Sequence, residues 1–213
     1  MDMEKELDTI RILAISGSLR ASSSNTAVLR AAITLTPKNV DITVYGGLAE
    51  LPHFNPDLNY GAAPHPVADL RCQLQASDGL LISSPEYAHG VPGAMKNALD
   101  WLVGSGELVG KPVALINTSP RATWAQASLT ETLTVMMASF INEASITLPL
   151  LGRELDAIGI AADPEISLVL RSAAAVNLSN PASGLRPSAA LGLLSCGIDI
   201  GSVNQCRNTI ADI

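Results

Sequence analysis

The chain has 213 residues, of which 47% are apolar, 15% charged and 3% aromatic, so it is not a disordered chain and its core must be aliphatic. Its formal net charge of −7 argues against binding to nucleic acid or an anionic membrane surface, because both require clustered Lys and Arg. No apolar run approaches the ~20 residues that cross a bilayer, so no membrane insertion is expected. The three cysteines lack C-x-x-C spacing and argue against a disulfide framework or a zinc site. With an acidic N-terminus unlike a signal peptide, these features predict a cytoplasmic protein.

Short aliphatic runs alternate with longer amphipathic segments along the chain. The runs predict five β-strands, at residues 9–15, 40–45, 79–83, 113–117 and 145–150. The amphipathic segments predict helices at residues 27–35, 67–76, 94–102, 124–141 and 165–178. The third and fourth runs are apolar at successive positions, as in strands that are covered on both faces. The alternation predicts an α/β fold with a parallel sheet, and a ligand beyond the carboxyl ends of its strands.

The last part of the sequence differs in composition from the rest. We expect residues 1–180 to form one domain, since no repeat or linker divides them. Residues 181–213 are rich in Ser, Gly, Ala and Leu, show poor periodicity, and are interpreted as an appended tail of uncertain structure. An arm that contacts another subunit is the alternative interpretation of this tail.

A polar loop follows the first predicted strand and precedes a helix. It contains hydroxyl side chains, a guanidinium and an amide, which belong to Ser18, Arg20, Ser23, Asn25 and Thr26. A helix N-terminus stabilises a phosphate through its unpaired N–H groups and its dipole, and hydroxyl and guanidinium groups add hydrogen bonds. The alternative is a simple N-cap, but a cap requires one residue rather than this series. The loop lacks G-x-G-x-x-G and G-K-[ST], which favours a mononucleotide over a dinucleotide or a triphosphate.

A second unusual loop follows the third predicted strand. Two prolines and two glycines lie within residues 84–93 and restrict its backbone shape, and Tyr87 offers a planar face to a ring. Such a shape indicates backbone groups directed at a ligand, although a rigid turn is the alternative.

The two loops together resemble the NADPH-dependent FMN reductase family, which includes flavodoxin-like quinone, chromate and azo-dye reductases. The resemblance lies in GSLR-x-x-S-x-N at residues 17–25 and SPEY-x-H-G-x-PG-x-x-KNALDW at residues 84–101. Residues 51–58 and 111–119 also resemble the family, and the similarity extends over residues 9–178. The resemblance implies a flavodoxin-like three-layer sandwich with a five-stranded parallel sheet in the order 2-1-3-4-5.

The resemblance also implies a site and an activity. FMN is expected as cofactor, its phosphate held by Ser18, Arg20, Ser23, Asn25 and Thr26, and its ring near Pro85, Glu86, Tyr87 and Ser119. The implied function is a ping-pong NAD(P)H oxidoreductase, with NADPH or NADH as co-substrate and a quinone-like, azo or metal-oxyanion acceptor. Members of this family commonly form dimers or tetramers, so the resemblance implies a homodimer or homotetramer. No residue is assigned a catalytic or metal-binding role, because the flavin performs the redox chemistry.

Two departures from the family keep alternatives open. Ala88 stands where the family usually has Asn, and the loop after Ser119 has fewer glycines than usual. Together with the tail, they keep open a regulatory or binding module without flavin. A flavodoxin-type electron carrier is the other competing hypothesis, although the hydroxyl- and glycine-rich phosphate loop of flavodoxins is not matched here. His53, His65 and His89 are interpreted as surface or loop residues, and Trp101 and Trp124 as packing residues rather than flavin contacts.

Overall fold

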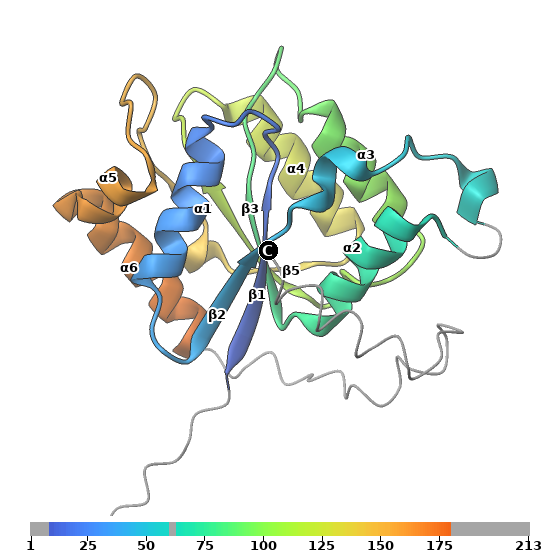
Figure 1. Cartoon of the computed structure of the whole chain (residues 1–213), viewed down its shortest axis with the longest axis horizontal. Helices are drawn as coiled ribbons and strands as arrows, with labels where there is room; N and C mark the ends of the chain where they lie inside the picture. The colour runs from blue at the N-terminus through green and yellow to red at the C-terminus, as the bar shows by residue number, and fades with distance from the viewer. Residues whose placement is uncertain (1–8, 60–62, 180–213) are drawn as a thin grey trace, which may run out of the picture. The chain divides into compact units, whose positions relative to one another are not determined.

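The computed structural model describes residues 9–59 and 63–179, so the predicted tail at 181–213 lies outside the described residues (Figure 1). A parallel sheet lies at its centre, in the order β2-β1-β3-β4-β5, with β6 also paired to β4. Its strands are β1 (Ile10–Ser16), β2 (Val40–Val44), β3 (Gly79–Ser83), β4 (Pro112–Asn117), β5 (Ser139–Phe140) and β6 (Ile146–Thr147). The predicted flavodoxin-like order is confirmed.

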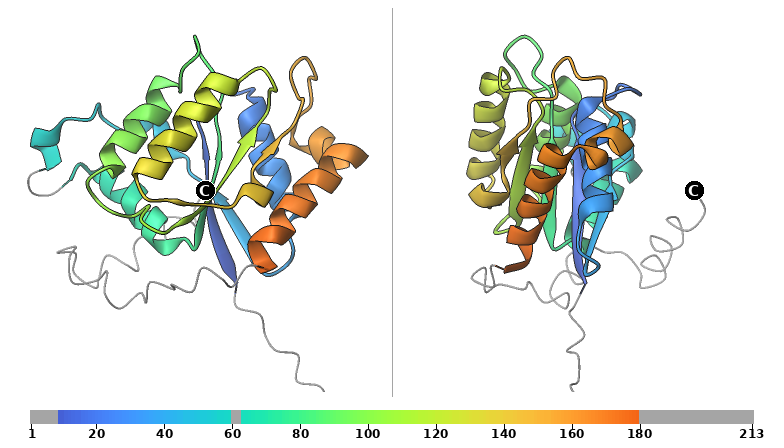
Figure 2. Two further views of the ribbon diagram at one scale, coloured as in Figure 1. Left: turned by 180° about the vertical axis from the view of Figure 1, so that it is seen from behind. Right: turned by 90° about the vertical axis from the view of Figure 1, so that its left-hand side faces the viewer.

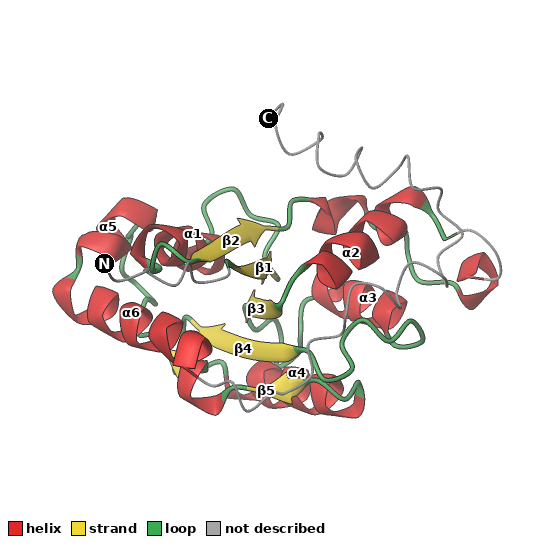
Figure 3. Cartoon of the chain, turned by 90° about the horizontal axis from the view of Figure 1, so that it is seen from below, coloured by secondary structure: helices red, strands yellow, loops and turns green. Residues whose placement is uncertain are grey.

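Helices cover both faces of this sheet, as Figures 2 and 3 show. One face packs against α1 (Ser24–Leu35), α5 (Ala157–Ala162) and α6 (Pro164–Ser179), and the other against α2 (His65–Ala76), α3 (Gly93–Leu102) and α4 (Thr123–Val135). Short 3-10 helices, η1 (Gly47–Glu50), η2 (Pro56–Asn59) and η3 (Asn142–Ala144), lie in the connections. Within the described ranges, none of the helices has the length and hydropathy needed to cross a membrane.

The alternation of side chains along β1 explains the two cores. Leu13 and Ile15 enter the cluster with α2, α3 and α4, whereas Ile12 and Ala14 enter the cluster with α1, α5 and α6. Successive strand residues point to opposite faces, so a strand covered by helices on both faces is apolar at every position. The same rule explains β3, all of whose residues are buried.

The structure differs from the prediction at the fifth strand position. The predicted helix 124–141 ends at Val135, because Met137 has a left-handed backbone (φ 60°) that a right-handed helix does not tolerate. The chain then forms β5, which pairs with the start of β4, and β6, which pairs with its end. Only β6 falls within the single strand predicted at 145–150, and β5 lies within the predicted helix 124–141. The sheet therefore has six strands in the described part of the chain instead of the predicted five. Helix α5 was not predicted.

Candidate functional site

The phosphate loop predicted from the sequence forms the N-terminus of α1. Ser23 is the N-cap, and its Oγ accepts a hydrogen bond from the Thr26 N–H at 3.4 Å. Ser18 Oγ accepts from the Arg20 N–H at 3.4 Å. In both serines the hydroxyl hydrogen remains available, because the oxygen acts only as an acceptor in these bonds. The two side chains can therefore still donate to an anion.

The charge distribution around this helix end favours an anion. The first turn of α1, which the structure describes in full, contains no acidic residue that would offset the positive end of the helix dipole. The exposed Arg20 forms no ion pair with any residue in the described ranges. An uncommitted guanidinium thus lies in the same loop as two uncommitted hydroxyl donors, which is a suitable set for a terminal phosphate.

Asn25 connects this loop to two other strand ends. Its side chain is buried, and Oδ1 accepts hydrogen bonds from Ser83 Oγ at 2.9 Å and from Thr118 Oγ1 at 3.3 Å. Ser83 is the last residue of β3, and Thr118 follows β4. The amide oxygen therefore faces the sheet, while the Nδ2 donors of Asn25 are left for a ligand. Thr26, in contrast, shares its hydroxyl with Ser16 Oγ at 2.8 Å, so this side chain is already engaged within the loop.

Gly17 brings the first loop into direct contact with the second, the loop that follows β3. A Cβ atom at this position would lie 2.2 Å from Ser84 Oγ and 3.1 Å from Ser84 Cα, so glycine is required there. The Gly17 N–H also donates to the Ser83 carbonyl at 2.8 Å. The two loops that the sequence singled out are therefore packed together at the carboxyl ends of adjacent strands.

The second loop closes in a tight hairpin turn. Tyr87 and Gly90 exchange backbone hydrogen bonds of 3.1 and 3.0 Å, and the two residues between them, Ala88 and His89, have φ values of 49° and 60°. Two successive positive φ values define a type I′ turn, in which Asn and Gly are the preferred residues. Ala88 thus adopts a backbone conformation that alanine disfavours. The turn leaves Tyr87 53% exposed at the candidate site.

Glu86 has a structural contact that the sequence did not reveal. Its Oε2 accepts a hydrogen bond of 2.8 Å from the Ala125 N–H in the first turn of α4, and its Oε1 lies 3.3 Å from His89 Nδ1. A carboxylate at a helix N-terminus satisfies an unpaired N–H and interacts favourably with the helix dipole. The Glu86 side chain therefore fixes the hairpin loop to α4. Because the carboxylate is engaged there, it is the backbone of residues 85–87 that remains available to a ligand.

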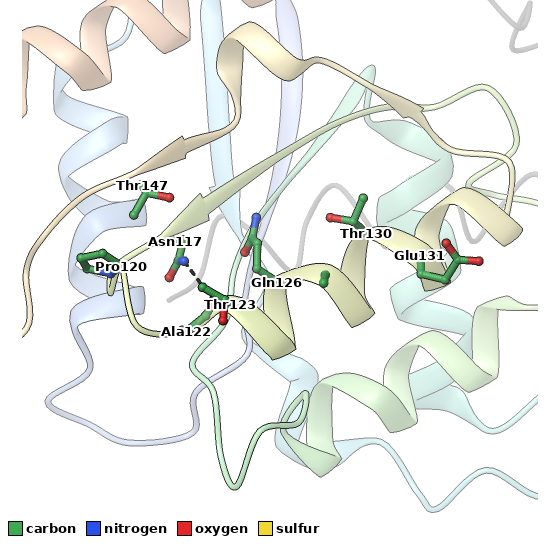
Figure 4. Close-up of a pocket in the computed structure, with 9 residues that line it drawn as sticks. Asn117, Pro120, Ala122, Thr123, Gln126, Thr130, Glu131 and Thr147 are labelled. Carbon is green, nitrogen blue, oxygen red and sulfur yellow. Dashed lines mark hydrogen bonds between the residues drawn. The ribbon is translucent and has the colours of Figure 1, made fainter.

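The loop after β4 is held by Asn117. The Ser119 N–H donates to Asn117 Oδ1 at 3.0 Å. Asn117 Nδ2 donates to the Ala122 carbonyl at 3.2 Å, as Figure 4 shows. Both ends of the side-chain amide are thus used to shape residues 117–122. The shape of this loop therefore depends on hydrogen bonds from a polar side chain.

The helix α3 positions the remaining family-like segment. Asn97 accepts from the Phe54 N–H at 2.8 Å, and both Asn97 Nδ2 and Trp101 Nε1 donate to the Pro52 carbonyl, at 3.0 and 2.8 Å. Phe54 packs edge-on against Trp101 at a centroid distance of 5.1 Å. Asn97 and Trp101 of the KNALDW segment therefore have a structural role, which is to hold residues 52–54.

The predicted site residues lie in three loops at the carboxyl ends of the neighbouring strands β1, β3 and β4, and in the first turn of α1 that follows the first loop. The first group is Ser18, Arg20, Ser23, Asn25 and Thr26, the second is Pro85, Glu86 and Tyr87, and Ser119 is the third. The sequence interpretation gave no role to four buried polar residues, Ser16, Ser83, Asn117 and Thr118. Ser83 and Thr118 link the loops through Asn25, whereas Ser16 and Asn117 form hydrogen bonds within their own loops. Ser83 could have been noticed, because it is a polar residue at the end of an otherwise apolar run.

The expectations for the aromatic residues and the histidine are met in part. Trp101 is fully buried, which confirms it as a packing residue. The same interpretation of Trp124 was wrong, since this side chain is 63% exposed beside the hairpin, with its ring 5.7 Å from that of His89. His89 is an exposed loop residue, as expected.

The sheet order and the helix layers define a flavodoxin-like α/β protein, and the loop that follows β1 is its candidate nucleotide site. The family model described as NADPH-dependent FMN reductase matches residues 10–150, which is more than half of the 213 residues. The chain therefore belongs to the NADPH-dependent FMN reductase family, oxidoreductases that use FMN and NAD(P)H.

Individual relatives agree with this assignment. A protein of Pseudomonas aeruginosa named NAD(P)H-dependent FMN reductase is 34% identical over 157 residues, covering 71% of this chain and 84% of its own length. A quinone reductase of Escherichia coli is 35% identical over 115 residues, which are 53% of this chain and 61% of that protein. Among solved structures, the flavoenzyme NAD(P)H:(acceptor) oxidoreductase FerB from Paracoccus denitrificans aligns with a TM-score of 0.64 at 29% identity, over 80% of this chain and 94% of that one.

Proposed function

We propose that the protein is an FMN-dependent NAD(P)H oxidoreductase that passes electrons by a ping-pong mechanism to a quinone-like, azo or metal-oxyanion acceptor. The observation that supports it most is the convergence of three hydrogen-bonded loops on the N-terminus of α1, where hydroxyl and guanidinium donors remain uncommitted. The names of the Pseudomonas and Escherichia relatives support reduction of a flavin and of quinones.

The residues present fit FMN by the chemistry of their donors. The terminal phosphate would be held by the Ser18 and Ser23 hydroxyls, Arg20, the Asn25 amide and the N–H groups of the first turn of α1. The Thr26 hydroxyl, which is engaged with Ser16, would contribute through the loop it stabilises. Hydroxyl, amide, backbone N–H and guanidinium groups are all hydrogen-bond donors at neutral pH. No change of protonation state is therefore required for them to bind the phosphate.

The flavin ring would lie along the second and third loops. Bound FMN supplies the redox chemistry, taking a hydride from NAD(P)H and passing two electrons to an acceptor. The backbone of Pro85, Glu86 and Tyr87 would orient the ring, while the contact from Glu86 to α4 keeps that backbone in place. Ser119 would border the ring from the loop after β4. The exposed Tyr87 side chain would shield one edge of the ring from water.

A spectroscopic titration tests this function. The purified protein is supplemented with FMN, desalted and examined for the flavin absorbance bands. NADH or NADPH is then added without oxygen, followed by a quinone. The proposal predicts a yellow protein that is bleached by the nicotinamide and coloured again by the quinone. A flavoprotein that reacts only slowly with NAD(P)H would be an electron carrier instead, and a protein that retains no flavin would be a binding module.

Several accompanying properties follow from the sequence and the family. We propose a cytoplasmic homodimer or homotetramer in which residues 1–180 form the FMN-binding domain and residues 181–213 an appended tail. Size-exclusion chromatography with light scattering on the full chain and on a chain ending at residue 180 measures the subunit number. The same two samples show whether the tail is needed for flavin binding.

A further inference from the structure

A pocket of about 620 Å³ lies beside the candidate flavin site, on the side of the β4–α4 loop where α4 faces β6. Figure 4 shows Gln126, Thr130 and Glu131 along α4, with Asn117 and Thr147 on the strands opposite. Pockets of roughly 300–1,000 Å³ hold ligands of cofactor and drug size. Nothing in the flavin site described above uses this volume.

The side chains that line the pocket favour a neutral part of a ligand that carries hydroxyl groups. Thr123, Thr130 and Thr147 each offer a hydroxyl, and Gln126 offers both an amide donor and an acceptor. Among the described residues that line it, Glu131 is the only one with a charged side chain. A carboxylate accepts hydrogen bonds from two neighbouring hydroxyls, and it repels a phosphate group at the same position. A ribose with a free diol meets these requirements.

The pocket and the flavin site share one loop. Asn117, in the pocket wall, shapes residues 117–122 through its bonds to the Ser119 N–H and the Ala122 carbonyl. On the other side of this loop, Thr118 is bonded to Asn25 in the phosphate loop. The exposed Arg121 follows Pro120 in the same loop, so this loop carries a cation next to pocket-lining residues in the sequence. A ligand in the pocket would therefore lie next to a molecule that reacts at the flavin.

We propose that this pocket binds the adenosine ribose of the nicotinamide dinucleotide, and that Glu131 selects NADH over NADPH. This inference rests on the proposed function, because it concerns the co-substrate of that reaction. The carboxylate accepts from the 2′- and 3′-hydroxyls of NADH, as an acidic residue does in other dinucleotide sites. In NADPH the 2′-phosphate would lie against the same carboxylate. Arg121 is assigned to the diphosphate that joins the two halves.

Calorimetric titration with ADP-ribose tests the pocket without any turnover of the flavin. ADP-ribose is the part of NADH that lacks the nicotinamide, and its 2′-phosphorylated form is the matching part of NADPH. The wild-type holoprotein is expected to bind ADP-ribose at least about tenfold more tightly than the 2′-phosphorylated form. This factor is the one expected when one hydrogen bond to a charged group is lost. Glu131→Gln should weaken ADP-ribose binding about tenfold, and Glu131→Lys should reverse the preference. Glu165→Gln, on α6 across the sheet, is the charge-matched control and should change neither affinity.

Activity provides the second readout. The ratio of kcat/KM for NADH to that for NADPH should exceed 1 in the wild type and fall below 1 in Glu131→Lys. FMN content, read from the same samples, should be equal in all variants. Retained FMN together with absent ADP-ribose binding, or with equal binding by wild type and Glu131→Gln, would overturn this inference while leaving the proposed function in place. Failure of the wild type to retain FMN would instead overturn the proposed function.

Discussion

The substitution Asn25→Asp separates the two tasks that the structure gives to this side chain. Aspartate keeps an oxygen that accepts from Ser83 Oγ at 2.9 Å and from Thr118 Oγ1 at 3.3 Å, and a carboxylate is favourable at a helix N-terminus. The free energy of unfolding should therefore change by no more than about 1 kcal/mol. FMN affinity should fall at least about 100-fold, because the amide donor is lost and a unit charge ~4 Å from the phosphate costs about 4 kcal/mol at a dielectric constant of ~20.

Titration with two flavins measures this effect by quenching of flavin fluorescence. Riboflavin has no phosphate, so its affinity should change less than about threefold in Asn25→Asp. Asn25→Ala provides the complementary variant, since it removes both hydrogen bonds to Oδ1 and should lower the stability by about 1–2 kcal/mol. Asn142→Asp, an exposed change of the same charge, is the control for net charge. Equal weakening of FMN and riboflavin by Asn25→Asp would refute the assignment of the phosphate to this loop.

Three further predictions concern the loops and the sheet. Gly17→Ala should lower FMN affinity at least about tenfold, since the new Cβ would meet Ser84 and separate the two loops. Ala88→Asn should raise the melting temperature by about 2 °C, because asparagine tolerates the positive φ of 49° better by about 0.5–1 kcal/mol. Asp78→Asn should lower the free energy of unfolding at pH 7. It should also make the decrease in this free energy smaller as the pH falls. Burial alone would raise the pKa of Asp78, but hydrogen bonds and charge from Arg11 lower it overall. The contribution of Asp78 to stability is therefore present above the unfolded pKa of about 3.9, and it is lost as the pH falls below that value.

Matched variants accompany these three measurements. Gly46→Ala introduces the same Cβ where nothing lies within 4 Å and φ is −93°, so flavin affinity should be unchanged. Ala162→Asn lies at the end of α5 and should give no gain in melting temperature. Asp41→Asn removes the same charge from an exposed position and is the charge-matched control for Asp78→Asn. A variant and its control that behave alike would contradict the corresponding argument.

Much of the fold could be predicted from local patterns in the sequence. Strands β1, β3 and β4 are apolar at successive positions because helices cover both faces, and this signal does not depend on distant residues. The end of α4 was missed because the left-handed conformation of Met137 has no marker such as glycine or proline. The short strands that follow are too brief for a periodic signal to identify.

The candidate site was predicted as a set of loops, but not as a connected network. Asn25 contacts Ser83 and Thr118, which are 58 and 93 positions away in the sequence. Glu86 reaches Ala125 in the same manner, 39 positions away. Such contacts depend on which strands are neighbours, and a single sequence does not specify side-chain partners at that separation. The structure therefore adds the reason why an amide and a carboxylate stand in these loops.

The central claim is that the N-terminus of α1 binds the phosphate of FMN, and a crystal structure of the FMN complex tests it most directly. The account predicts a phosphate within hydrogen-bond distance of the Ser18 and Ser23 hydroxyls and of the N–H groups of the first turn of α1. It also predicts the isoalloxazine ring against the backbone of residues 85–87. A phosphate bound elsewhere, with this loop filled by its own side chains, would contradict the account.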